Sequence, residues 1–140
     1  MRKAGSVASI SVLVVAAALL VQVGCGHPTQ MTGISITPTA ATVIGRGAGA
    51  TVQYTAYGTF IHPAETRDVT KQVTWTSAIP DVATVQNGLV TSGIGCGTTI
   101  VTATANRDLV NNGSSQGIMA ATATFTVADP NDPLCPKPPQ

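Results

Sequence analysis

The sequence predicts an all-β fold: a sandwich of two facing antiparallel sheets with seven or so short strands, preceded by a signal peptide helix. Val, Thr and Ile, which favour pleated and half-buried surfaces, alternate with other residues along most of the chain. The 14 Gly and 9 Pro supply frequent turns. Charged residues make up only 9% of the chain, and beyond the N-terminal segment no stretch shows helical periodicity.

Residues 1–24 are predicted to be a signal peptide. Arg2 and Lys3 precede an apolar run whose uninterrupted centre is residues 12–21. A basic start followed by a short apolar stretch is typical of secretory signals. A permanent transmembrane helix is the alternative, but it needs about 20 apolar residues, and polar residues dilute both ends of this run.

The end of this segment resembles a bacterial lipobox. Val23, Gly24 and Cys25 match the pattern, whereas Gln22 stands where Leu is usual. The resemblance implies cleavage before Cys25 and attachment of a lipid to its sulfur, after which residues 25–32 form a polar tether. Each buried CH₂ of a lipid contributes about 0.8 kcal/mol, so two or more chains hold a protein firmly. Plain secretion and an uncleaved anchor are the alternatives.

Residues 33–128 are expected to form the domain, and residues 129–140 a Pro-rich C-terminal tail. Strands are expected, in chain order, at 34–38, 40–44, 50–58, 73–77, 82–86, 89–92, 98–105 and 118–128. Turns are expected at the Gly-rich 45–49, at Ile79-Pro80-Asp81, at Asn87-Gly88 and at 93–97, with a polar hairpin loop at 106–117. Residues 60–72 are charged and are expected to be an irregular, solvated insert, which makes them a candidate for a partner contact.

The alternation also predicts which side chains point inward. They are Val52, Tyr54, Ala56, Val73, Trp75, Ala83, Val85, Val101, Ala103, Ala123, Phe125 and Val127. Because Ala and Thr are abundant, the core should be thin, and Trp75, the only Trp, is expected to be its largest buried side chain, in the middle of the sandwich. A sugar-stacking role for Trp75 is the less favoured alternative.

Four motifs resemble the bacterial immunoglobulin-like domain, group 2. They are VTWTS at 73–77, PDVATV at 80–85, GLVT at 88–91 and the Gly-initiated strand at 97–103. They occur in the family's order, and the likeness extends over about residues 34–105. The resemblance implies an Ig-like sandwich that serves as a surface module for adhesion, spacing or display. The chain departs from the family pattern at the insert 60–72 and at Cys96.

The three Cys suggest one bridge. If Cys25 carries a lipid, Cys96 and Cys135 remain as an even pair in an oxidising compartment. Cys96 precedes the penultimate strand and Cys135 follows the last, so an antiparallel hairpin would bring them together. We expect a disulfide that returns the tail to the domain; two free thiols are the alternative.

Nothing in the sequence indicates a catalytic set. His27 and His62 are the only histidines, and no metalloprotease, nucleophile-elbow or phosphate-binding motif is present. The segment Asp129-Pro130-Asn131-Asp132 is similar to the acidic calcium linker of cadherins, but acids and Pro also end strands. We therefore expect no enzyme activity, no cofactor, no metal and, with a net charge of +1, no nucleic-acid partner.

The expected function is that of a non-enzymatic, lipid-anchored cell-envelope protein with a single Ig-like domain, acting in adhesion, surface binding or envelope structure. Its partners would be the membrane, through the lipid, and other envelope proteins or polysaccharide. A small secreted carbohydrate- or calcium-binding module is the alternative. The expected location is the outer membrane or the cell surface, or the medium if the protein is secreted.

Overall fold

A computed structural model describes residues 29–47, 49–107 and 117–138, and within them every regular element is a β-strand. In chain order the strands are β1 (Gln30–Thr37), β2 (Ala40–Ile44), β3 (Thr51–Gln53), β4 (Thr55–Ile61), β5 (Glu65–Asp68), β6 (Thr74–Ser77), β7 (Ala83–Gln86), β8 (Leu89–Ser92), β9 (Gly97–Asn106) and β10 (Ile118–Ala128). The predicted all-β fold is confirmed. The expected signal peptide and its helix lie outside the described residues.

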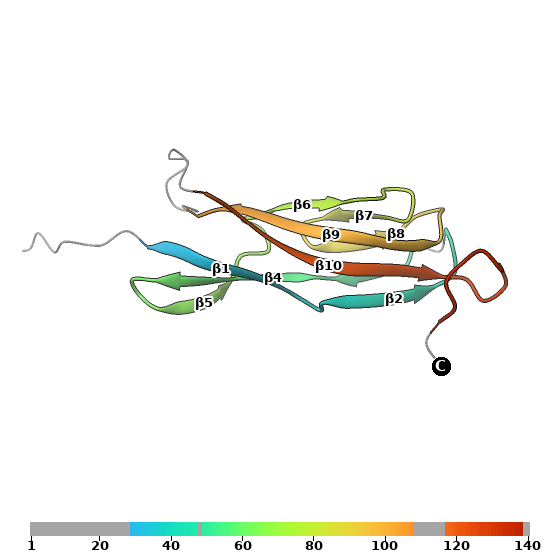
Figure 1. The fold of residues 1–140 in the computed structure, drawn as a ribbon, viewed down its shortest axis with the longest axis horizontal. Coiled ribbons are helices and arrows are strands. Elements are labelled where there is room, and N and C mark those ends of the chain that lie inside the picture. Colours follow the sequence, from blue (N-terminus) through green and yellow to red (C-terminus); the bar gives the residue numbers. More distant parts are fainter. Residues whose placement is uncertain (1–28, 48, 108–116, 139–140) are drawn as a thin grey trace, which may run out of the picture.

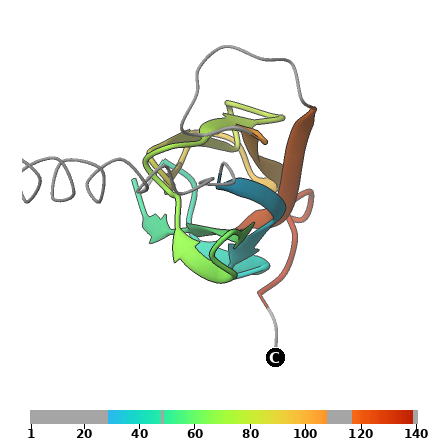
Figure 2. The same ribbon diagram turned by 90° about the vertical axis from the view of Figure 1, so that its left-hand side faces the viewer.

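The strands form three hydrogen-bonded sheets, with the orders β1-β4-β5, β2-β10-β9-β6 and β3-β8-β7. They are arranged along the long axis of the molecule (Figure 1) and surround a common interior when viewed from one end (Figure 2). All strand pairs are antiparallel except β2 with β10, which is parallel. The expectation of purely antiparallel sheets is wrong at this pair, because β2 continues in the direction of β1 after the chain has crossed to the other sheet.

The chain changes sheet at two places, one between two strands that the sequence predicted as separate and one inside a strand that it predicted as continuous. The first is Pro38, which cannot donate to a ladder, between β1 and β2. The second is Tyr54, where the expected strand 50–58 divides into β3, paired with β8, and β4, paired with β1. The Tyr54 backbone N–H donates instead to the Gly88 carbonyl oxygen at 2.8 Å. Val52 on β3 and Ala56 on β4 keep the predicted inward phase across this division.

Two segments are more regular than expected. Strand β1 begins at Gln30, inside the segment expected to be tether, because Met31 is fully buried. The charged insert is a hairpin of β4 and β5, not an irregular loop. Its apolar residues explain this: Phe60 is buried, and the Arg67 guanidinium carbon lies 4.0 Å from the Phe60 ring centroid. The insert therefore belongs to the sandwich and extends one of its sheets.

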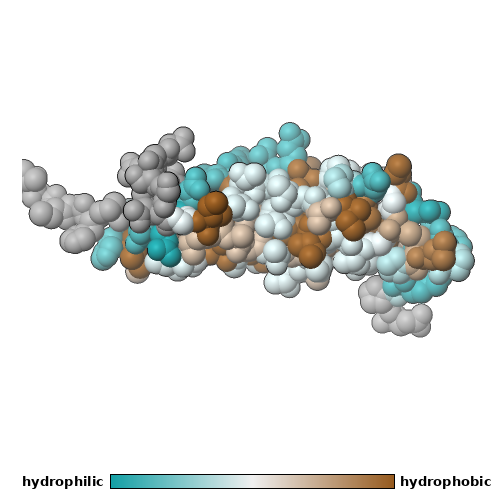
Figure 3. All heavy atoms as spheres, turned by 45° about the horizontal axis from the view of Figure 1, so that its top comes forward, coloured by the Kyte–Doolittle hydropathy of each residue, from teal (hydrophilic) through white to brown (hydrophobic). Residues whose placement is uncertain are grey.

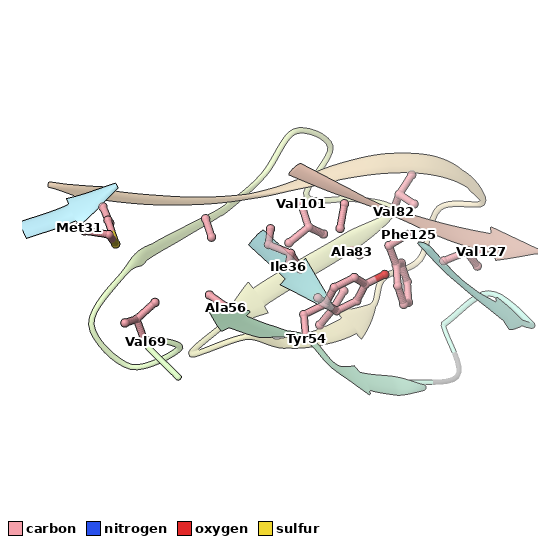
Figure 4. Close-up of a cluster of buried hydrophobic side chains, with 14 of the residues drawn as sticks. Met31, Ile36, Tyr54, Ala56, Val69, Val82, Ala83, Val101, Phe125 and Val127 are labelled. Atoms are coloured by element: carbon pink, nitrogen blue, oxygen red, sulfur yellow. The ribbon is translucent and has the colours of Figure 1, made fainter. Parts of the chain in front are cut away.

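The core contains most of the predicted inward residues, but Trp75 is not at its centre. Its largest fully buried side chains are Tyr54, Phe60, Phe125 and Met31, and the Tyr54 and Phe125 rings lie close together in the interior (Figure 4). Trp75 is only partly buried, packed against this core from the edge strand β6. Its indole N–H donates to the Thr70 carbonyl oxygen at 2.8 Å. Because β6 is the last strand of its sheet, no further strand lies beyond it. The indole of Trp75 therefore packs at the edge of the core and not at its centre.

The first strand and the C-terminal residues lie at opposite ends of the sandwich (Figure 1). The described residues contain no helix that is long and apolar enough to cross a bilayer. On the face viewed in Figure 3, exposed apolar side chains are separated from one another by less hydrophobic surface.

Candidate functional site

The C-terminal end of the sandwich is closed by the predicted disulfide. Cys96 and Cys135 are bonded, with their Cα atoms 5.6 Å apart. Cys96 precedes β9 and Cys135 follows β10, and these two strands pair antiparallel, as the sequence argument required. The Asp129 backbone N–H also donates to the Pro136 carbonyl oxygen at 3.3 Å. The first part of the tail is thereby folded back onto the domain.

The acidic segment after β10 forms ion pairs with a cationic side chain of the protein itself. Arg46 forms ion pairs with Asp129, at 3.5 Å, and with Asp132, at 3.1 Å. The other oxygen of each carboxylate accepts a backbone N–H, from Asn131 at 3.0 Å and from Leu134 at 2.9 Å. These oxygens and the guanidinium form a local cap over the strand end, and a calcium ion would have to displace Arg46 to use them.

A cluster of Cys96, Asp132 and Cys135 has potential ligand atoms within 4.8 Å of one another. Both sulfur atoms belong to the disulfide, however, and a metal-ligating cysteine must be a thiolate. Of the other residues singled out in the sequence, Cys25 and His27 lie outside the described residues, and His62 lies in the exposed β4–β5 turn with φ 60°. Among the described residues, His62 is not part of this cluster.

An open pocket of about 530 Å³, lined by polar and charged residue types, lies beside the point where β3 passes into β4. Its lining residues are Gln53, Thr55, Asp68, Thr70, Lys71, Gln72 and Asn87. Four of them, Asp68, Thr70, Lys71 and Gln72, come from the charged insert, the segment expected to offer a partner contact. The others are distant in sequence, and only the β3–β4 crossover and the β7–β8 turn bring them there. Sequence reasoning therefore missed the pocket while marking part of its wall.

The walls of this pocket are held by hydrogen bonds. Gln53 Nε2 donates to the Tyr54 carbonyl oxygen at 2.7 Å and lies 3.4 Å from that of Asn87. The Thr70 backbone N–H donates to Asp68 Oδ1 at 2.8 Å. Hydrogen bonding by the Thr70 hydroxyl, and then by its N–H, lowers the pKa of the Asp68 carboxyl below its ordinary value. Asp68 is therefore an oriented carboxylate at neutral pH.

The β7–β8 turn completes the pocket in a conformation that the sequence predicted. Asn87 and Gly88 both have positive φ, 50° and 80°, as a tight two-residue hairpin turn requires. A side chain at Gly88 would collide with the Tyr54 carbonyl oxygen and lie 2.7 Å from Gln53 Nε2. Gly88 thus permits the hairpin to approach the crossover closely enough to form one wall.

A comparison with models of protein families supports this architecture. A comparison with curated proteins gave no match. The family model of the bacterial Ig-like domain (group 2) matches residues 30–115, more than half of the chain, and its start coincides with the first residue of β1. Such domains are typically extracellular or surface-exposed modules and are generally non-catalytic. The chain therefore belongs to the family of bacterial Ig-like domains, group 2.

Proposed function

We propose that this protein is a non-enzymatic, lipid-anchored module of the bacterial cell envelope that presents its Ig-like domain for adhesion or surface binding. The observation that carries the proposal is the family membership together with a Cys immediately after an apolar N-terminal run. Lipid chains on Cys25 would hold the protein at a membrane, and the envelope is where surface modules of this family act.

The position of β1 indicates which end of the sandwich would lie near the membrane. Four residues, 26–29, separate the sulfur-bearing Cys25 from the first strand residue, Gln30, so the chain between them has five residue-to-residue steps. At about 3.5 Å per extended residue, this tether spans at most roughly 17 Å. The β1 end of the sandwich would then stay near the membrane, and the opposite end, with the Cys96–Cys135 bridge, would face away from it.

The absence of enzyme activity is part of the proposal and rests on the chemistry of the described side chains. Within the described part of the chain His62 is the only histidine, and it lies in an exposed turn. Asp129 and Asp132 are paired with Arg46. Asp68, the carboxylate of the pocket, has a lowered pKa, which suits a hydrogen-bond acceptor better than a general acid. These groups support binding rather than proton transfer.

The anchor is tested by mass spectrometry of the N-terminal peptide from membrane fractions of a bacterial host. The expected result is a chain that begins at Cys25 with diacylglycerol on its sulfur. Cys25→Ser should move the protein out of the membrane fraction or leave it unprocessed, whereas the double variant Cys96→Ser with Cys135→Ser should stay anchored. A mature wild-type chain without lipid on Cys25 contradicts the proposal.

A second candidate function, that of a small secreted binding module, is favoured by the polar pocket alone. For this candidate, calcium is the less suitable ligand because Arg46 already occupies the acidic cap. Thermal melting with and without added calcium tests this point: we expect an unchanged melting temperature. A calcium-dependent rise that Asp132→Asn abolishes would show that the cap is a metal site.

A further inference from the structure

We propose that the pocket at the β3–β4 crossover, with Tyr57 at its rim, binds neutral hexopyranose oligosaccharides. This inference names the ligand class for the proposed surface-binding role and rests on that role. Three features of the described residues point to such a ligand: an exposed aromatic ring, side chains that can both donate and accept hydrogen bonds, and a lining with balanced charge.

Tyr57 is the exposed aromatic side chain of this chain. The chain has two Tyr, two Phe and one Trp, and all of them are described. Tyr57 is 38% exposed, whereas Tyr54, Phe60 and Phe125 are buried and Trp75 seals the core margin. The face of a pyranose ring carries C–H groups that pack on the electron-rich face of an aromatic ring, so an exposed Tyr offers a platform that is apolar on its face and polar at its hydroxyl.

The sheet register places Tyr57 next to two of the residues that line the pocket. Tyr57 on β4 is directly opposite Asp68 on β5, and cross-strand neighbours have Cβ atoms about 5 Å apart. Thr55, two residues before Tyr57 on the same face of β4, also lines the pocket. A sugar ring stacked on Tyr57 would therefore lie within reach of the Asp68 carboxylate and the Thr55 hydroxyl.

The polar lining matches the hydroxyl groups of a sugar. Gln53, Gln72 and Asn87 contribute amides, each with donor and acceptor groups, and a sugar hydroxyl can use both. Gln53 Nε2 is engaged by backbone carbonyls, while its Oε1 has no hydrogen bond among the described residues. The amide is thus oriented by the protein and keeps one acceptor for a ligand.

The charge and the size of the pocket favour a neutral saccharide. Asp68 and Lys71 are its charged lining residues, and they carry opposite charges. The carboxylate would repel a polyanion and the ammonium would repel a polycation, whereas a neutral sugar can form hydrogen bonds with both groups. A volume of about 530 Å³ lies within the usual range of roughly 300–1,000 Å³ for small-molecule sites.

The experiment is an NMR titration of the full ¹⁵N-labelled chain in zwitterionic dodecylphosphocholine micelles, because glycosidic detergents would compete for the pocket. Maltohexaose, cellohexaose and N-acetylchitohexaose are added separately. At least one is expected to give saturable shifts confined to the pocket and to Tyr57. Tyr57→Ala should weaken that binding about tenfold or more, and Tyr57→Phe, which keeps the ring, should weaken it less than about threefold.

Ile100→Ala is the matched control, because Ile100 is a half-exposed apolar residue (48% exposed) on β9, in another sheet. It should leave the affinity unchanged, and melting curves of all variants exclude a loss of folding. The proposal is overturned if none of the three saccharides shifts the pocket resonances, or if Tyr57→Ala binds as well as the wild type. The recombinant chain is titrated without lipid, so a failed titration leaves the anchor proposal standing, and a failed lipid analysis leaves the titration valid.

Discussion

The side-chain hydroxyl of Tyr54 forms a hydrogen bond to a strand of another sheet. Tyr54 lies where the chain passes from β3 to β4, and its side chain is fully buried. Its hydroxyl donates to the Thr124 carbonyl oxygen of β10, in another sheet, at 2.7 Å. Tyr54→Phe removes this hydrogen bond and preserves the ring that packs near Phe125. We expect the variant to fold and to be less stable than the wild type.

The expected loss follows from the surroundings of the acceptor. An intramolecular hydrogen bond contributes about 0.5–1.5 kcal/mol net, and a buried carbonyl left without a partner costs about 1–3 kcal/mol. The Tyr54–Thr124 bond is partly buried, and Thr124 itself is an exposed residue. Water can therefore reach the freed carbonyl in part, and a loss of about 1 kcal/mol is expected. Truncation to Ala would instead remove the ring and cost about 3–5 kcal/mol.

Trp75, the only Trp, provides the assay. Its fluorescence in a urea titration should show a midpoint about 0.5 M lower for Tyr54→Phe, with an unchanged slope, if the slope is about 2 kcal/mol per M. Tyr57→Phe removes the same atom from an exposed ring and should change the free energy of unfolding by less than about 0.5 kcal/mol. Equal effects of the two substitutions would refute the assigned role of the buried hydroxyl.

Three further predictions concern the same region and the tail. Replacing Cys96 and Cys135 with Ser, which opens a bridge of sequence separation 39, should lower the free energy of unfolding by about 4 kcal/mol; an unchanged melting temperature would count against it. Gly88→Ala should lower the free energy of unfolding by about 3 kcal/mol or more, because the new methyl group would collide with the Tyr54 carbonyl oxygen. Gly47→Ala, at φ 64° but with no atom near its Cβ, should lower it by about 1 kcal/mol. Calorimetry of the two variants compares these losses. Burial raises the pKa of Tyr54 above its ordinary 10.0, so the unfolded chain ionises first: stability should hold below about pH 10 and fall above it, less so in Tyr54→Phe, as urea titrations at several pH values would show.

The strand faces could be predicted because they depend on neighbouring residues alone. Side chains alternate across any strand, so the inward positions of Val101, Ala103 and Phe125 follow from the pattern of residues. The Asn87-Gly88 turn is equally local, because it depends on the tolerance of these residues for positive φ. The disulfide required one further step, the antiparallel pairing of consecutive strands.

The remaining features depend on which strands lie at the edges and on which distant loops meet. Trp75 was expected at the centre because its phase is inward, but phase does not reveal that β6 is an edge strand. The charged insert was expected to be irregular because its charges are visible in the sequence, while the packing of Phe60 beneath Arg67 is not.

By itself, the sequence determined the all-β class, the family, the inward faces and the tight turns, since each of these is written in residue types at short spacing. Only the tertiary structure decided the crossover at Tyr54, the pairing of Arg46 with the acidic tail and the pocket between Gln53 and Asn87. These contacts join segments far apart in the chain, and their geometry depends on how whole sheets pack.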